Sequence, residues 1–174
     1  KSGNTVSVNG SNALTYGDKL SKLGFSEVTF VEADTDTEVK GTLEWADPDC
    51  IPTAGMTQAG WVFKPTDNKH YEELTGTADI TVAKATPVIA EKPTAGALTY
   101  GQKLSDSKLT GGKAAYPTAD GTEITGTFTW KNSSIKPTAA DSQKTEYDAT
   151  FTPSDKDNYN AVDTKIALTV NKAA

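Results

Sequence analysis

Apolar and polar residues alternate along several short stretches of the chain. In ADITV (78–82) and IALTV (166–170), an apolar residue stands at every second position, which is the period of a β-strand with one buried face. This alternation predicts that Ile166, Leu168 and Val170 point into a core. No stretch carries a helical stripe of apolar residues at i, i+3, i+4 and i+7, so the pattern predicts an all-β protein.

Two further strands are predicted from GTLEW (41–45) and GTFTW (126–130), in which alternate positions carry large apolar residues. Each stretch ends in a tryptophan, Trp45 or Trp130. A small domain buries only about 60–65% of its unfolded surface, and one buried aromatic side chain covers about 150–250 Å². We therefore expect both tryptophans to fill cores.

The segment AGWVF (59–63) places Trp61 on the same strand face as Phe63, which predicts that Trp61 also packs in a core. Residues 28–45 read as a hairpin that turns near positions 34–36, where Asp and Thr interrupt two strand-like segments. Short strands separated by turn residues in this way are typical of a β-sandwich.

The chain repeats itself. NALTYGDKLS (12–21) returns as GALTYGQKLS (96–105) with eight of ten residues identical, and FKPTDNKHY (63–71) returns as FTPSDKDNY (151–159). The order of the matches is preserved while the offset grows from 84 to 88 residues, as expected for a duplication whose loops accept insertions. The sequence therefore predicts two tandem β-sandwich domains, residues 1–85 and residues 86–174.

The predicted junction between the repeats is short. VAKATPVIAEKP (82–93) runs from the last strand of the first repeat into the first strand of the second. Pro87 fixes its own backbone and favours an extended conformation at Thr86. A junction this short is unlike a flexible linker, so we expect a stiff or semi-stiff connection.

Composition and charge exclude several classes of function. The net charge is −6, and all 17 basic residues are lysines, whereas arginine is the residue best suited to bidentate recognition of phosphate and guanine. We therefore expect no nucleic-acid partner. The sequence contains no run of 18 apolar residues, so we also expect no membrane insertion. The single cysteine, Cys50, excludes an intrachain disulfide. The first ten residues lack the apolar core of a signal peptide. We therefore expect this chain to be an interior part of a longer polypeptide.

The order ALTYGxKL, GTFTW, FTPSDKDNYNAV and ALTVNKA resembles the bacterial immunoglobulin-like repeats, which occur in tandem in large secreted or wall-attached proteins, notably of Gram-positive gut bacteria. The resemblance covers nearly the whole chain. It implies two immunoglobulin-like sandwiches, an extracellular or cell-wall location, neighbouring domains as partners, and a spacer or adhesion role without catalysis. It also implies that Tyr71 and Tyr159, each four residues after an aspartate, are corner tyrosines. Ala161 and Glu73 stand where an antibody-like domain would have cysteine.

The sequence offers little for catalysis or cofactor binding. The one histidine, His70, stands in a predicted turn, and no phosphate-loop, HExxH or CxxC motif is present. We therefore predict no enzyme, no catalytic residue, no cofactor and no metal. Two alternatives stay open. Calcium could bind the alternating acids of EADTDTE (32–38), and an isopeptide bond could involve Lys84 or Lys172.

A ligand-binding role is the alternative to a spacer. Sugars stack on exposed aromatic rings, and Tyr116 has no aromatic counterpart in the first repeat. Trp61 is the second candidate, although its position beside Phe63 favours the core. We therefore predict a monomeric, non-catalytic spacer of an extracellular bacterial surface protein, with a glycan- or host-protein-binding adhesion module as the alternative.

Overall fold

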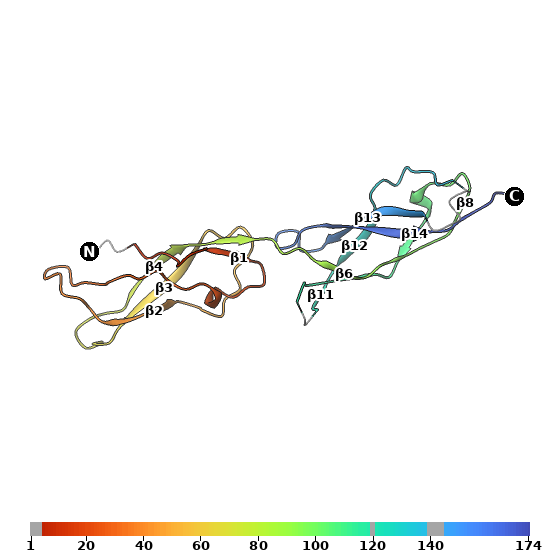
Figure 1. Ribbon diagram of the computed structural model, residues 1–174. Helices are drawn as coiled ribbons and strands as arrows, with labels where there is room; N and C mark the ends of the chain where they lie inside the picture. The colour runs from red at the N-terminus through yellow and green to blue at the C-terminus, as the bar shows by residue number, and fades with distance from the viewer. Residues whose placement is uncertain (1–4, 119–120, 139–144) are drawn as a thin grey trace. The chain divides into compact units, whose positions relative to one another are not determined.

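The computed structural model describes residues 5–118, 121–138 and 145–174 (Figure 1). In these residues the regular structure consists of β-strands and two single-turn 3₁₀ helices, without an α-helix. The all-β class predicted from the sequence is therefore confirmed. The chain divides into two compact units, Lys1–Lys84 and Ala85–Ala174, called unit 1 and unit 2 below.

Unit 1 is built around an antiparallel sheet of three strands in the order β2-β3-β4, while a short parallel pair joins β1 to β5. The predicted hairpin is present, because Val31 pairs with Glu38 and Asp36 takes the left-handed backbone conformation at the turn. The elements of unit 1 are β1 (Ala13–Thr15), η1 (Leu20–Lys22), β2 (Gly41–Trp45), β3 (Gln58–Pro65), β4 (Leu74–Asp79) and β5 (Thr81–Ala83).

Unit 2 repeats this plan with more of its backbone paired. Its main sheet has the order β12-β13-β14, a second has the order β11-β10-β6, and β15 pairs with β8 in parallel. The elements are β6 (Val88–Glu91), β7 (Thr94–Ala95), β8 (Leu98–Thr99), η2 (Leu104–Asp106), β9 (Leu109–Thr110), β10 (Lys113–Ala115), β11 (Glu123–Ile124), β12 (Gly126–Trp130), β13 (Thr145–Pro153), β14 (Val162–Leu168) and β15 (Val170–Asn171).

Ala85 belongs to unit 2. Its amide donates to the carbonyl of Asn158 at 2.9 Å, and its carbonyl accepts from the amide of Asn160 at 2.9 Å. The sequence comparison placed this residue at the end of the first repeat. Only Lys84 therefore lies between the end of β5 and the first backbone that is paired within unit 2.

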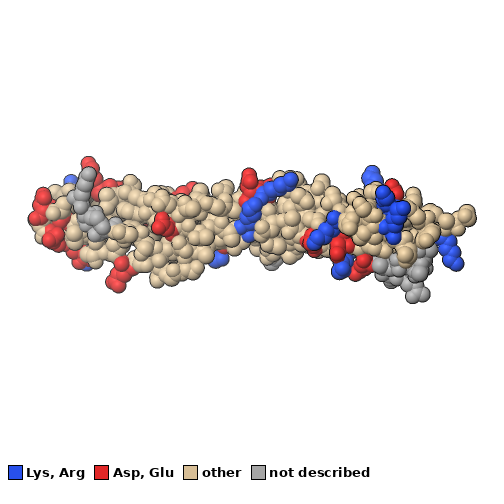
Figure 2. Space-filling model, turned by 90° about the horizontal axis from the view of Figure 1, so that it is seen from above, with Lys and Arg blue, Asp and Glu red and all other residues tan. Residues whose placement is uncertain are grey.

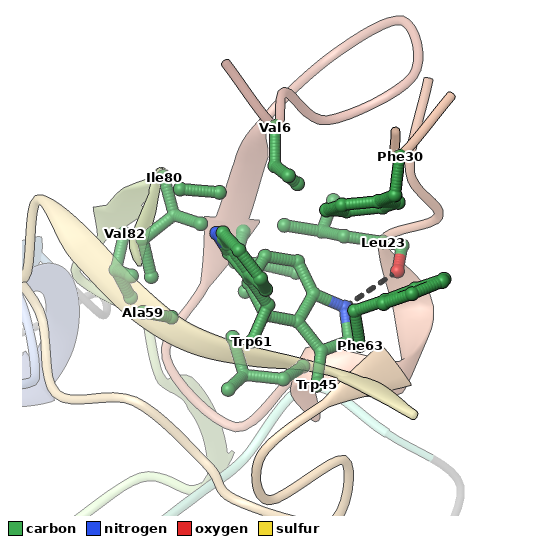
Figure 3. Packing of buried hydrophobic residues seen from close by; sticks show 12 residues of the cluster. Val6, Leu23, Phe30, Trp45, Ala59, Trp61, Phe63, Ile80 and Val82 are labelled. Atoms are coloured by element: carbon green, nitrogen blue, oxygen red, sulfur yellow. Dashed lines mark hydrogen bonds between the residues drawn. The ribbon is translucent and has the colours of Figure 1, made fainter. Parts of the chain in front are cut away.

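The predicted core faces are confirmed. Ile166, Leu168 and Val170 are each no more than 3% exposed. In unit 1 the alternate residues of β3 point into one cluster together with Trp45 of β2 and with Phe30 (Figure 3). Phe30 stacks on Phe63 with 4.0 Å between ring centroids.

Both tryptophans that were expected to fill cores donate one hydrogen bond to a distant carbonyl. The indole Nε1 of Trp45 donates to the carbonyl of Leu23 at 2.8 Å (Figure 3), and that of Trp130 donates to the carbonyl of Ser107 at 2.9 Å. Trp45 is buried and Trp130 is half-buried. The same bond thus ties β2 and β12 to the segment that follows the 3₁₀ helix in each unit.

Trp61 needs a glycine as its neighbour. It pairs with Gly76 on β4, and a Cβ added to Gly76 would lie 2.4 Å from Cζ2 of the indole. In unit 2 the matching pair is Ala149 and Thr164. In unit 1 the large side chain of this pair is on β3 and the small residue is on β4. In unit 2 the small residue, Ala149, is on β13 and the larger one, Thr164, is on β14.

A second close approach occurs in both units. A Cβ added to Gly41 would lie 2.4 Å from the carbonyl oxygen of Lys64 and 2.5 Å from Cζ of Phe63. One added to Gly126 would lie 2.4 Å from the carbonyl oxygen of Thr152 and 2.5 Å from the ring of Phe151. The glycine that opens each GTxxW segment therefore makes room for a core phenylalanine of the next strand.

The repeated ALTYG segment is closed by a side-chain acceptor in each unit. In unit 1 the amide of Thr15 donates to Oδ2 of Asp18 at 2.9 Å, and in unit 2 the amide of Thr99 donates to Oε1 of Gln102 at 2.7 Å. Lys22 also donates to Asp18 at 2.9 Å. The two units thus make the same turn with an ionisable acceptor in one and a neutral acceptor in the other.

Candidate functional site

Trp61 lies in the core of unit 1. Its side chain is part of the buried cluster and the residue is 6% exposed. The indole Nε1 is buried and has no hydrogen-bond partner in the part of the chain that the structure describes. A ring in this position packs against protein, as its place beside Phe63 predicted, and it offers little surface on which a sugar could stack.

Tyr116 lies in unit 2 and is half-buried. It packs against the cluster formed by Ala114, Ile124 and Phe151, and its amide donates to the carbonyl of Thr122 at 2.8 Å. Trp61 and Tyr116 therefore belong to the clusters of different units, and the fold of neither unit brings them together. A ligand-binding role for either ring stays a prediction.

The aspartates that precede the two predicted corner tyrosines organise their turns. The amide of Tyr71 donates to the carbonyl of Asp67 at 3.1 Å, and the amide of Tyr159 donates to the carbonyl of Asp155 at 3.2 Å. The carboxylate of Asp155 also accepts from the amide and side chain of Asn158. The same backbone bond therefore closes both turns, and Tyr159 packs against the cluster of Ala114, Ile124 and Phe151 in unit 2.

His70 occupies the position in the first turn that Asn158 has in the second, and it is exposed. Its Nδ1 lies 2.7 Å from Oδ2 of Asp67. The hydrogen bond with His70 holds the pKa of the Asp67 carboxyl below its usual value. Both side chains face solvent, which fits a solvated turn and not a catalytic pair in a closed site.

An open groove of about 610 Å³ lies beside Tyr71 in unit 1. Its rim carries Glu32, Glu72 and His70, and Leu74 is 46% exposed beside it. A second hollow, of about 570 Å³, is also lined by Tyr71 and Val39. The apolar residues that line the larger groove, called the unit 1 groove below, include Phe30, Val39, Phe63, Pro65, Tyr71 and Leu74.

Sequence reasoning did not find the unit 1 groove, because its walls come from three separate segments. One signal was present: Leu74 directly follows two glutamates and begins a strand otherwise built from small and polar residues. Its partner in the sheet is Phe63. An exposed leucine opposite a core phenylalanine indicates a face that is not fully covered.

The loops around the unit 1 groove are strongly acidic. Residues 31–40 and 65–74 contain seven carboxylates and two lysines, a net charge of −5 with His70 neutral. Figure 2 shows acidic side chains gathered at this end of unit 1, at the left of the view. Among the described residues, no three His, Cys, Asp or Glu side chains are grouped so that they could hold a metal ion. The calcium alternative therefore gains no site from the described geometry.

Oppositely charged side chains pair across the exposed faces of both main sheets. Lys64 pairs with Glu44 in unit 1, while Lys131 pairs with Asp163 in unit 2. Lys165 also donates to Asp148 at 2.9 Å. Water screens exposed pairs of this kind, and they contribute little to stability. They are therefore surface contacts of the sheets and do not define a binding site.

Comparisons with known proteins give structural neighbours only. No protein-family model matches the chain, and no curated protein does. None of the described residues belongs to a helix with the length and apolar character needed to cross a bilayer.

Among solved structures, the chain is similar to titin domains Z1Z2 in complex with telethonin, with 13% identity, a TM-score of 0.27, and coverage of 99% of this chain and 96% of that one. It is also similar to domains 4–9 of the surface layer protein SbsC, with 15% identity and a TM-score of 0.27, over 97% of this chain and 30% of that one. A chimeric titin Z1Z2 carrying a KLER peptide from decorin gives 12% identity and a TM-score of 0.24 over 97% and 95% of the two chains. At these values no function passes from the neighbours to this chain, whose all-β class rests on its own strand pairing.

Proposed function

We propose that the chain is a non-catalytic spacer of an extracellular, multidomain bacterial surface protein. The proposal is supported by the use of one all-β unit twice, with one residue between β5 and the first paired backbone of unit 2. Its partners in this role are the neighbouring domains of a longer polypeptide. The chain works as a monomer that separates them and bears load.

The observation that carries the proposal is that the last strand of each unit pairs with a strand from the early part of the same unit. In unit 1 the early strand β1 runs parallel to the last strand β5, and in unit 2 β8 runs parallel to β15. The amide of Thr81 donates to the carbonyl of Asn12 at 2.9 Å, and that of Leu98 donates to the carbonyl of Thr169 at 3.0 Å. An early strand of each unit is thus joined directly to its last strand.

The parallel pairing of an early strand with the last strand suits a load-bearing spacer. A force on the polypeptide pulls β1 by its N-terminal side and β5 by its C-terminal side. Because the two strands are parallel, they are drawn along each other in opposite directions, and their hydrogen bonds are loaded together. A hairpin pulled by its two adjacent ends loses its bonds one at a time. The observed pairing therefore favours resistance to force.

Single-molecule force spectroscopy on the whole chain tests this function. We expect two separate unfolding events, each releasing about 300 Å of contour length, since an extended residue spans about 3.3–3.6 Å and the units hold 84 and 90 residues. Thr81→Pro removes the donor to Asn12 and should lower the unfolding force of one event only. Thr81→Ala keeps the amide and is the matched control. Gradual extension at low force, or equal forces for both variants, would refute a load-bearing role.

The adhesion alternative is tested separately by affinity electrophoresis through gels that contain soluble polysaccharides. Retardation that is lost on Tyr116→Ala, in a protein that remains folded, would establish glycan binding and contradict a pure spacer. Unchanged mobility in every gel leaves the spacer as the function. Exposure of the protein to protease on intact cells of its source tests the extracellular location.

A further inference from the structure

Asn9 is the only asparagine of the chain that a glycine follows. The carboxamide carbon of an asparagine can be attacked by the backbone nitrogen of the next residue, and a side chain on that residue crowds the approach. Glycine has no Cβ and adopts the widest range of backbone conformations. The sequence therefore makes the Asn9–Gly10 pair the place where this reaction meets the least hindrance.

The fold leaves both reacting groups accessible. Asn9 and Gly10 are exposed, and Gly10 takes the left-handed conformation with φ 71°. A Cβ added to Gly10 would have no heavy atom within 4 Å. Among the described residues, neither the side chain of Asn9 nor the amide of Gly10 has a hydrogen-bond partner. The carboxamide and the nitrogen that would attack it are therefore both free to move.

Most of the other described asparagines are held by hydrogen bonds of their side chains. These bonds join Asn12 to the carbonyl of Asp79 at 3.3 Å, Asn132 to the amide of Ser134 at 3.2 Å, Asn158 to the carboxylate of Asp155 at 2.9 Å, and Asn160 to the hydroxyl of Thr86 at 3.0 Å. Asn68 is exposed, but the residue after it is Lys69, whose amide donates to Asp67 at 3.3 Å. Asn68 is therefore a natural reference for Asn9 within the same chain.

Asn9 lies between two points at which the backbone of unit 1 is anchored. On one side, the amide of Asn9 itself donates to the carbonyl of Gly24 at 2.9 Å. On the other side, directly before β1, the carbonyl of Asn12 accepts from the amide of Thr81 at 2.9 Å. Any backbone atom added at residue 9 must therefore be taken up within the short stretch before Asn12, or by the loss of one of these bonds.

We propose that Asn9 is a site of spontaneous deamidation, which converts it to aspartate and isoaspartate and, in the isoaspartyl form, weakens unit 1. The backbone nitrogen of Gly10 bonds to Cγ of Asn9 while the Cγ–Nδ2 bond breaks. The side-chain NH₂ leaves as ammonia with the proton of the Gly10 amide, and a cyclic succinimide remains. Water then opens the ring. Breaking the new bond to Cγ gives aspartate, and breaking the original peptide bond gives isoaspartate.

The two products differ in what they do to the backbone. Each replaces a neutral amide with a carboxylate, so each adds one negative charge to a chain whose net charge is −6. Aspartate keeps the backbone as it was, whereas the backbone of isoaspartate runs through Cβ and Cγ and is one atom longer. Only isoaspartate therefore strains the stretch between the two anchored points. This modification is independent of the spacer function, because it needs no force and no neighbouring domain.

The first test is peptide mapping by mass spectrometry after the folded whole chain has been kept in mildly alkaline buffer made with water enriched in heavy oxygen. We expect heavy oxygen to enter at Asn9 at least about tenfold faster than at Asn68, because Gly10 does not crowd the attack. The rate should rise with pH, since the Gly10 nitrogen attacks after losing its proton. The peptide SVNGSNA, with the sequence of residues 7–13, should react within about tenfold of the folded chain, because the site is exposed.

Two variants locate the reaction. Gly10→Ala should slow the labelling of Asn9 at least about tenfold, because the added Cβ crowds the attacking nitrogen. Asn9→Gln keeps an amide at an exposed position and lengthens the side chain, so it should take up no label at residue 9. The second variant leaves the backbone of Gly10 unchanged and serves as the control if alanine does not tolerate the left-handed conformation there.

The second test measures the effect on unit 1. The aspartyl and isoaspartyl forms are separated by chromatography and unfolded in urea, with the indole signal of Trp45 reporting on unit 1 and that of Trp130 on unit 2. We expect a lower midpoint of unit 1 in the isoaspartyl form alone, and an unchanged midpoint of unit 2. The Asn9→Asp variant has a normal backbone and should unfold as the wild type does.

Three results would overturn the proposal. The first is a folded chain that reacts more than about 100-fold more slowly than the peptide, which would mean that the fold protects Asn9. The second is heavy oxygen entering Asn68 as fast as Asn9. The third is an isoaspartyl form with the unit 1 midpoint of the wild type, which would show that the modified backbone does not disturb unit 1.

Discussion

Replacing Gly76 with alanine tests whether the indole of Trp61 and the backbone of β4 are in direct contact. The added Cβ would lie 2.4 Å from Cζ2 and 2.8 Å from Cε2 of Trp61. The ring is rigid and buried, so strand or ring must move. Overpacking of this kind costs about 1–3 kcal/mol, while removing a strand glycine returns about 0.5–1 kcal/mol. We expect the free energy of unfolding of unit 1 to fall by about 1–2 kcal/mol.

The measurement is urea unfolding followed by the indole N–H signals in NMR spectra. Trp45 and Trp61 report on unit 1 and Trp130 reports on unit 2, so each spectrum contains its own control. With a slope of about 1 kcal/mol per molar urea, the midpoint of unit 1 should shift down by about 1–2 M. The midpoint of unit 2 should not change.

Gly60→Ala is the matched control for the change at Gly76. A Cβ at Gly60 would meet its nearest neighbour, the Cβ of Ala46, at 3.6 Å, which is an ordinary contact. We expect this variant to be as stable as the wild type or slightly more stable. If Gly76→Ala leaves the unit 1 midpoint unchanged or raises it, the close packing of Trp61 on β4 is refuted.

Three further predictions follow from the pairs of matching residues in the two units. Gly41→Ala should destabilise unit 1 alone and Gly126→Ala unit 2 alone, each by more than Gly76→Ala does, because the added Cβ meets a backbone carbonyl; equal effects on both midpoints would contradict this. Trp45→Phe and Trp130→Phe each leave a carbonyl without its indole donor. Each should lower the free energy of unfolding of its unit by about 1–3 kcal/mol, with the larger loss at the more buried Trp45. Calorimetry of both variants checks this order. Partial burial raises the pKa of Asp18, but its hydrogen bonds with the Thr15 amide and Lys22 outweigh this and leave the pKa lowered. This contribution to stability is therefore present above the unfolded-state pKa of about 3.9 and is lost as the pH falls through the lower folded-state value. Asp18→Asn should remove that acid sensitivity from unit 1, as Gln102 does in unit 2, and an unchanged pH profile would refute the assignment.

Local patterns predicted the parts of the fold that depend on a single segment. The alternation in residues 166–170 identified the buried face of the last strands, and the acidic turn at 34–36 marked the hairpin. Neither needs knowledge of a distant neighbour, because a period of two residues and a turn are properties of the local chain.

The features that escaped prediction depend on contacts between distant segments. The carbonyl of Leu23 accepts the hydrogen bond of the Trp45 indole only after two distant segments have packed together. The residues next to Gly76 in the sequence likewise do not indicate that the indole of Trp61 lies against it. The unit 1 groove needs Val39, Tyr71 and Leu74 to be brought together from separate loops and strands.

The unequal pairs Trp61–Gly76 and Ala149–Thr164 also bear on how such a chain folds as it is synthesised. Neighbouring units of similar sequence are prone to exchange strands and to become trapped in misassembled states. A strand β3 paired with β14 would set the Trp61 indole against Thr164, whose Cβ needs the space that Gly76 leaves open. The opposite hybrid, β13 with β4, would leave a gap between Ala149 and Gly76. Each unit therefore recognises its own strands, and a chain of identical units should refold with a larger misassembled fraction than this one.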